Sequence, residues 1–68
     1  MKKYILSTTE QLRLCVSNDV VVEVMIEGEI DYIGKMTKVT DEIVGIRDGF
    51  YLRRNCIIRL KSKKRINK

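Results

Sequence analysis

The chain has 68 residues, enough for one domain with a small core. Fourteen Lys and Arg residues stand against nine Asp and Glu, which gives a net charge of +5, and His, Pro and Trp do not occur. These numbers exclude a multidomain enzyme, a His-based catalyst and a His-ligated metal site. They favour a small basic binding module. Residues 1–60 are electrically balanced, so we predict one domain over 1–60 and a basic tail over 61–68.

Nothing in the sequence predicts a membrane segment, a cofactor or a metal centre. No apolar run exceeds three residues, whereas a membrane span needs about 20. The polar stretch after Leu6 is unlike the core of an export signal, so we expect a cytoplasmic protein. Cys15 and Cys56 lie in apolar patterns without a CxxC pair, which is typical of free, buried thiols.

Residues 8–17 are predicted to form a short helix. Thr8 can cap it, and Gln11 three residues later completes a capping-box pattern. Leu12, Cys15 and Val16 then fall on one apolar stripe. The polar run 17–19 ends the helix.

The rest of the sequence predicts five antiparallel strands joined by short turns. Alternation of apolar and polar residues places the strands at 20–27, 30–39, 43–47, 50–53 and 56–61. Asp48-Gly49 is the strongest hairpin signal, because both residues tolerate positive φ, and Gly34 in mid-strand indicates a sharp bend or a bulge. A mainly β chain of this length is best closed as a small, strongly bent barrel.

Some apolar residues lie on strand faces opposite the main apolar positions. These residues are Val21, Met25, Ile33, Val39, Ile43 and Ile57. They are either scattered exposed side chains, which are common, or part of a subunit interface.

Two stretches of the chain resemble motifs of the Sm-like family, which includes the Hfq-type bacterial members. The first runs through 22–28, 32–36 and 39–41, with its glycine turn, its glycine in a bent second strand and Asp41 opening the third strand. The second is Leu52-Arg53-Arg54-Asn55-Cys56-Ile57, in which Arg54 stands where the family has glycine. Gly45 stands where the family has an asparagine that helps to hold uracil.

The resemblance implies an SH3/Sm-like barrel that assembles into a ring of identical subunits and binds RNA. The fourth strand of one subunit would pair with the fifth strand of the next. Carried over by position, Arg53 would contact a base, Asn55 would lie beside it, and Asp41 would orient the loop.

The densest basic cluster also points to nucleic acid, and together with the resemblance it favours RNA over DNA. Its members are Arg53, Arg54, Arg59, Lys61, Lys63, Lys64, Arg65 and Lys68. Such clusters bind phosphates by releasing counterions. Tyr51 lies on the opposite strand face from Phe50 and Leu52, so its ring could point outward and stack on a base. The alternatives are a tail that only aids solubility and an acidic protein partner.

A protein-interaction module of the same barrel type is the main alternative function. The small YolD-like accessory proteins, whose bent-strand pattern this chain also resembles, are one such possibility. Val21, Met25 and Ile57 would then dock onto a protein partner. Catalysis has little support, since a nucleophilic cysteine needs a base and there is no His.

Overall fold

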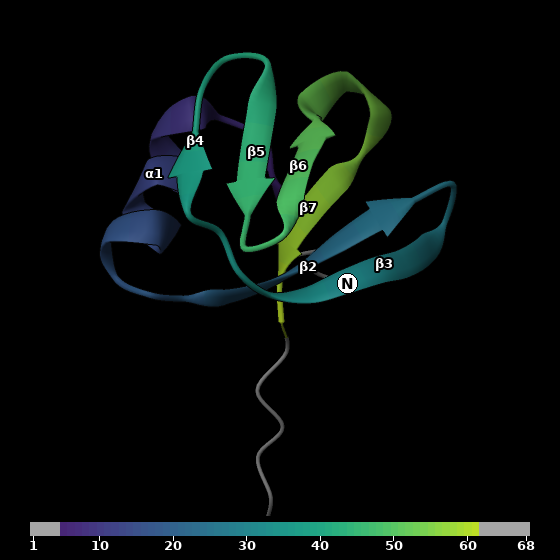
Figure 1. Ribbon diagram of the computed structural model, residues 1–68, viewed down its shortest axis with the longest axis horizontal. Coiled ribbons are helices and arrows are strands. Elements are labelled where there is room, and N and C mark those ends of the chain that lie inside the picture. Colours follow the sequence, from purple (N-terminus) through teal and green to yellow (C-terminus); the bar gives the residue numbers. More distant parts are fainter. Residues whose placement is uncertain (1–4, 62–68) are drawn as a thin grey trace, which may run out of the picture.

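The fold is known from a computed structural model, which describes residues 5–61 (Figure 1). A single helix and two antiparallel sheets make up this part of the chain. The elements are β1 (Ile5–Leu6), α1 (Thr9–Ser17), β2 (Val21–Ile26), β3 (Glu29–Lys35), β4 (Lys38–Val39), β5 (Ile43–Ile46), β6 (Gly49–Leu52), the 3-10 turn η1 (Arg53–Asn55) and β7 (Ile57–Leu60). The mainly β prediction with one short N-terminal helix is therefore confirmed.

Helix α1 has the N-terminal capping box that the sequence predicts, and it ends in the polar run 17–19. The Gln11 amide donates to Thr8 Oγ1 over 3.1 Å, and the Thr8 amide donates to Gln11 Oε1 over 3.2 Å, which completes the capping box. At the other end Asp19 adopts a φ of 55°. The Asp19 amide then donates to the Val16 carbonyl and the Val20 amide to the Cys15 carbonyl, a Schellman arrangement that turns the chain into β2.

The strands form two sheets. The first has the order β1-β7-β2-β3 and the second the order β4-β5-β6. Met36 and Thr37 alone separate β3 from β4, so one bent segment passes from the first sheet to the second. Within residues 5–61 no ladder joins the two sheets, so the strands are not closed into a barrel by hydrogen bonds.

A two-residue turn joins β2 to β3. Glu27 and Gly28 have φ angles of 53° and 83°, as a type I′ hairpin turn requires. Val24 pairs with Tyr32 and Met25 with Ile30, so Asp31 is the extra residue of a β-bulge. The bulge thus lies at Asp31 and not at Gly34. The need for glycine at position 34 has a different cause. A Cβ on Gly34 would come within 2.6 Å of the Tyr32 hydroxyl, so glycine makes room for that ring.

The β5–β6 hairpin forms where Asp48-Gly49 predicts one, but its conformation differs. Ile46 pairs with Gly49, so Arg47 and Asp48 make the turn. Positive φ angles in the described chain occur at Asp19, Glu27 and Gly28, and not at this turn. The predicted hairpin is therefore confirmed, although it does not use the positive φ that Asp48 and Gly49 tolerate.

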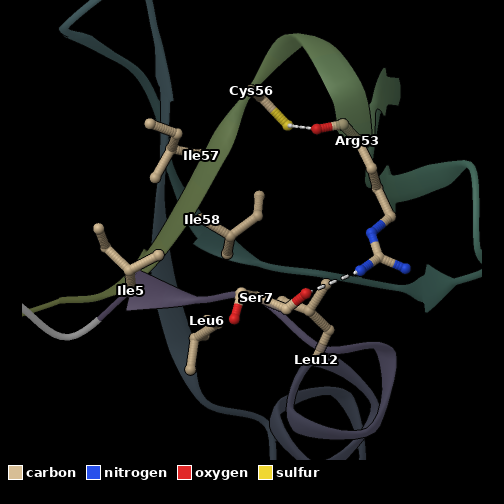
Figure 2. Close-up of a pocket in the computed structure, with 8 residues that line it drawn as sticks. All are labelled: Ile5, Leu6, Ser7, Leu12, Arg53, Cys56, Ile57 and Ile58. Carbon is tan, nitrogen blue, oxygen red and sulfur yellow. Dashed lines mark hydrogen bonds between the residues drawn. The ribbon is translucent and has the colours of Figure 1, made fainter.

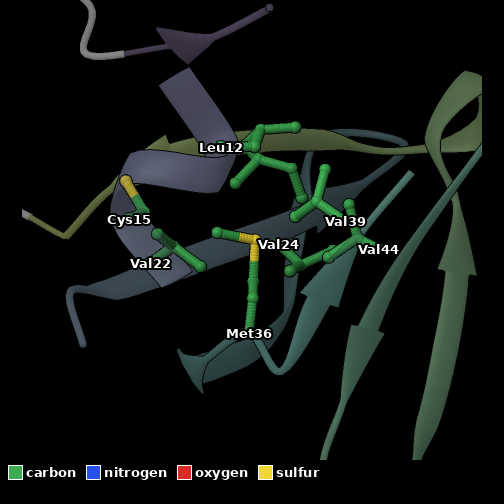
Figure 3. Packing of buried hydrophobic residues seen from close by; sticks show 8 residues of the cluster. Leu12, Cys15, Val22, Val24, Met36, Val39 and Val44 are labelled. Carbon is green, nitrogen blue, oxygen red and sulfur yellow. The ribbon is translucent and has the colours of Figure 1, made fainter. Parts of the chain in front are cut away.

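The core lies between the two sheets and α1 (Figure 3). Its buried members are Leu12, Cys15, Val22, Val24, Met36, Val39, Val44 and Ile58. Leu12 and Cys15 come from the predicted helix stripe. Val39 was expected on an outward face, but the bend between β3 and β4 turns it inward, where 8% of its surface is exposed. The expectation for Val39 is corrected accordingly.

Strand β1 is not among the predicted elements. Ile5 pairs with Arg59 and Leu6 with Ile58, on the edge of β7 that faces away from β2. A segment of two residues is too short to show alternation of apolar and polar side chains. Its pairing with β7 is therefore what defines β1 as a strand. β7 therefore has a hydrogen-bonded neighbour on each side.

Candidate functional site

Arg53, the first residue of η1, is held by hydrogen bonds within its own chain. Its guanidinium Nη1 donates to Thr9 Oγ1 over 2.6 Å and to the Thr40 carbonyl over 2.8 Å. Nη2 donates to the Ser7 carbonyl over 3.4 Å (Figure 2). The side chain is half-buried and joins η1 to the start of α1 and to the loop after β4. Because three of its N–H groups are used in this way, few of them remain to donate to a nucleic-acid base.

Asp41 contacts the same cluster. Thr9 Oγ1 donates to Asp41 Oδ1 over 3.2 Å, while Thr40 Oγ1 accepts from the amides of Glu42 and Ile43. Asp41 thus connects the loop after β4 to the first turn of α1. Its predicted role toward RNA stays a prediction.

Arg59 is neutralised by a carboxylate of its own chain. Its Nε donates to Glu23 Oε1 over 2.6 Å, and the two residues are direct partners on β7 and β2. Glu23 is almost fully buried, with 11% of its side chain exposed against 41% for Arg59. A buried carboxylate needs such a partner, so this pair stabilises the sheet. The predicted contact of Arg59 with phosphate stays a prediction.

Tyr51 faces the core side of its sheet. It pairs with Val44, which is fully buried, while Phe50 and Leu52 on either side of it are exposed. The prediction of an outward ring is therefore wrong, because the strand presents its other face to solvent. The Tyr51 hydroxyl donates to Asp31 Oδ2 over 2.6 Å. This hydrogen bond, with burial and the Asp31 charge, raises the pKa of Tyr51 to about 12.

The remaining predicted nucleic-acid residues are exposed but separated. Arg54 and Asn55 lie in η1, before β7, and Lys61 follows its end. Six residues of extended chain span about 20 Å, so the two groups lie at opposite ends of the strand. Lys63, Lys64, Arg65 and Lys68 lie outside the described residues. The members of the predicted cluster that lie within residues 5–61 are thus divided between internal contacts and two distant exposed groups.

A different surface is formed mainly by apolar residues that alternation left open as either scattered side chains or part of a subunit interface. The side of the four-stranded sheet away from the core carries apolar side chains, which we call the outer apolar face: Ile5, Val21, Met25, Ile30, Ile33 and Ile57. The exposed fractions of five of them run from 37% for Val21 to 51% for Ile57, and Met25 is half-buried.

The outer apolar face is organised in rows across the strands. One row passes through Ile5, Arg59, Glu23 and Ile33, which are successive partners on the four strands. The next row contains Ile57, Met25 and Ile30. The Arg59–Glu23 pair therefore lies in the middle of apolar side chains. Sequence reasoning identified Val21, Met25, Ile33 and Ile57 but missed Ile5 and Ile30, whose places depend on β1 and on the bulge.

A cavity of about 210 Å³ opens at the edge of this face (Figure 2). Its lining is mainly aliphatic, from Ile5, Leu6, Leu12, Ile57 and Ile58, with Ser7, Arg53 and Cys56 completing the wall. The cavity lies where β1 ends: at Ser7 the chain stops pairing with β7 and turns toward α1. Its volume is sufficient for one aliphatic side chain.

The two cysteines have thiols that favour the protonated form. Burial raises the pKa of both Cys15 and Cys56, and the nearby Arg53 charge lowers that of Cys56 by a smaller amount. Both are free, Cys15 in the core and Cys56 half-buried at the cavity. A raised thiol pKa opposes nucleophilic chemistry at neutral pH.

Residues 5–61 contain no candidate metal centre and no candidate membrane helix. No group of three or more His, Cys, Asp or Glu side chains in this part of the chain could hold a metal ion. No helix among the same residues is long and apolar enough to cross a membrane.

No family model, curated protein or solved structure significantly matches the chain. The resemblance to the Sm-like family therefore stays a prediction.

Proposed function

We propose that this chain is a non-catalytic protein-interaction domain that docks its partner on the outer apolar face. The observation that carries the proposal is the grouping of Ile5, Val21, Met25, Ile30, Ile33 and Ile57 on one face of one sheet. Contiguous exposed apolar patches are uncommon on monomeric soluble proteins and mark interaction sites.

The cavity beside Ile5 and Ile57 adds a second feature of a docking site. Protein interfaces obtain most of their binding energy from a few side chains seated in desolvated pockets. An aliphatic side chain of a partner would enter between β1 and the start of β7. Apolar contacts on the sheet would surround it and exclude water.

We also propose that the fold is an open small barrel of the Sm type. The bent segment from β3 into β4 links the two sheets into one strand order, β7-β2-β3 followed by β4-β5-β6. The short turn η1 then returns the chain from β6 to β7. This order is the basis of the proposal. Superposition of a solved structure of this chain on Sm-like proteins would test it.

The docking function can be tested by affinity capture with the full chain. Tagged wild-type protein and the Ile57→Asp variant are compared in nuclease-treated lysate of the cells that make the protein. Leu14→Asp is the matched control, since Leu14 is 59% exposed on α1, away from the outer apolar face. We expect one protein to be retained by wild type and by Leu14→Asp but lost with Ile57→Asp. Equal capture by all three chains would contradict the proposal, provided that circular dichroism shows each to be folded.

Nucleic-acid binding, with RNA preferred, is a second candidate. The exposure of Arg54 and Asn55 in η1 and of Lys61 beyond β7 favours it, as does the basic sequence of the last eight residues. Binding would be electrostatic, so raising salt from about 50 to 200 mM should weaken it by orders of magnitude if several phosphates are contacted.

Fluorescence anisotropy with labelled single-stranded RNA and DNA tests this candidate. Arg54→Gln and Lys61→Gln should each weaken binding by a similar factor for every sequence, because phosphate contacts carry no base choice. Binding that ignores salt, or no binding to either nucleic acid at low salt, would remove the candidate.

A further inference from the structure

The geometry points to a second copy of this chain as the partner on the outer apolar face, in a two-fold dimer packed sheet against sheet. The inference rests on the proposed docking function and names its occupant. Three features of the face carry it: the small core beneath, the alternation of its rows, and the opposite charges at its two ends.

The first feature is the size of the core. Eight buried hydrophobic residues form the core, while the six apolar residues of the outer apolar face lie on the side of the four-stranded sheet away from it. A chain of this size buries too little surface for high stability, and association is a common remedy. The two stretches of the sequence outside 5–61 are mainly polar: residues 1–4 read Met-Lys-Lys-Tyr, and Ile66 is the only aliphatic residue in 62–68.

The second feature is the complementarity of neighbouring rows. Consider a two-fold axis that lies between the two packed sheets and runs across the strands, midway between the Glu23 row and the Met25 row. Rotation about this axis places the Glu23 row of one copy over the Met25 row of the other. Glu23 of one copy then lies opposite Met25 of the other, and Arg59 opposite Ile57. Each ion pair is thereby covered by an apolar row, and like charges are kept apart. Sheets packed face to face with nearly aligned strands have this geometry.

The third feature is charge at the ends of the strands. Lys35 is the partner of Val21 at one end of the face, and Glu27 lies in the hairpin turn at the other end. Because the strands of the two copies run in opposite directions, the Lys35 end of one copy lies over the Glu27 end of the other. A face that carries both signs in this order is complementary to itself.

This dimer differs from the ring that the family resemblance implies. Ring pairing would use the edge of β7, and that edge is hydrogen-bonded to β1 at Ile58 and Arg59. The sheet-to-sheet dimer leaves β1 in place and even uses Ile5. The mass of the particle separates the two assemblies.

Light scattering of the full, nuclease-treated chain over a wide concentration range is the experiment. We expect a concentration-dependent mass approaching twice the 8.0 kDa of one chain. Ile57→Asp and Ile33→Asp should give the mass of one chain, while Leu14→Asp should behave as wild type. A dimer that both face variants leave intact, or a larger ring, would overturn the inference.

Charge reversal tests the predicted arrangement without disturbing apolar packing. Lys35→Glu and Glu27→Lys are both exposed changes, and each alone should weaken the dimer about tenfold, as like charges then meet. The double variant Lys35→Glu/Glu27→Lys should restore wild-type dissociation, because the opposite ends match again. Failure of the double variant to recover would reject this arrangement.

The mass of the wild type and the capture result together distinguish the second-copy dimer from docking of a different protein. If wild type is a monomer at every concentration but Ile57→Asp still loses a captured protein, the second-copy inference fails and the docking function stands. If wild type is a monomer and capture does not depend on the face, both fail.

Discussion

Arg53 and Arg59 are bound within their own chain, and each contact has a structural consequence. Arg53 connects Ser7, Thr9 and the Thr40 carbonyl, three points that are distant in sequence. Arg59 neutralises a buried carboxylate. Arg54, the neighbour of Arg53, is exposed beside Asp41 and Glu42. Adjacent arginines in one motif therefore serve stability and surface charge, respectively.

The first prediction concerns Arg53. Arg53→Met keeps the aliphatic stem but removes the guanidinium hydrogen bonds, so we expect the free energy of unfolding to fall by about 1–3 kcal/mol. Arg54→Met is the matched control and should change it by less than about 0.5 kcal/mol. Urea unfolding followed by circular dichroism measures both. Equal values for the two variants would show that the Arg53 contacts contribute nothing to stability.

The second prediction concerns the Tyr51–Asp31 hydrogen bond. The hydrogen bond to Asp31, together with burial and the Asp31 charge, raises the pKa of Tyr51 from its ordinary value of 10.0 to about 12 in the folded chain. Folding therefore favours the protonated phenol. The resulting stabilisation is complete below about pH 10 and is lost as pH rises toward 12.

Ultraviolet absorbance titration measures this shift in the native protein. One tyrosine should ionise near pH 12 in wild type, and Asp31→Asn should return it toward 10. Tyr51→Phe identifies the signal, because the high titration must then disappear. A high titration that survives in Tyr51→Phe would assign it to another tyrosine.

Among the elements, the β2–β3 hairpin depends most on local conformation. Its turn requires positive φ at both Glu27 and Gly28, and the bulge at Asp31 then directs a carboxylate to Tyr51 on the other sheet. The Tyr32 and Tyr51 rings also approach one another, with centroids 6.5 Å apart. The hairpin thus connects the two sheets through side chains where no backbone ladder does.

The third prediction is that Gly28→Ala destabilises this hairpin by about 1–2 kcal/mol, the cost of a left-handed conformation for a residue with a Cβ. Gly49→Ala is the matched control. Its Cβ would meet nothing within 4 Å and its φ is not positive, so we expect no loss. Thermal unfolding compares the two. A loss in Gly49→Ala as large as that in Gly28→Ala would refute the conformational explanation.

At the scale of the whole molecule, the two sides of the four-stranded sheet are both apolar. Its inner side contributes Val22, Val24 and Ile58 to the core, and its other side is the outer apolar face. Stability in a domain this small rests on very few side chains. Association through the second side would bury further apolar surface and add to the stability of each copy.

The fourth prediction tests this dependence on the core. Leu12 is 1% exposed, and Leu12→Ala should cost about 2–5 kcal/mol. Since a core of this size rarely supplies more than about 3–5 kcal/mol, we expect the variant to be largely unfolded at room temperature. Leu14→Ala, on the exposed side of the same helix, should remain folded. A cooperative native unfolding transition in Leu12→Ala would show that the core contributes more than about 3–5 kcal/mol to the free energy of unfolding.

The sequence by itself determined the local features of this protein. The capping box of α1, the apolar stripe of Leu12 and Cys15, and the five main extended segments all follow from residues close together in the chain. Each depends on hydrogen bonds or periodicity within a few residues, so neighbours in sequence suffice to specify them.

Only the tertiary structure decided which residues meet across the fold. It gave β1 its partner, turned Val39 and Tyr51 inward, and placed Arg59 against Glu23. These outcomes depend on which strands become neighbours and on where the chain bends, and alternation along one strand defines two faces without saying which is buried. The candidate site, an apolar sheet face assembled from four strands, therefore could be foreseen only in part.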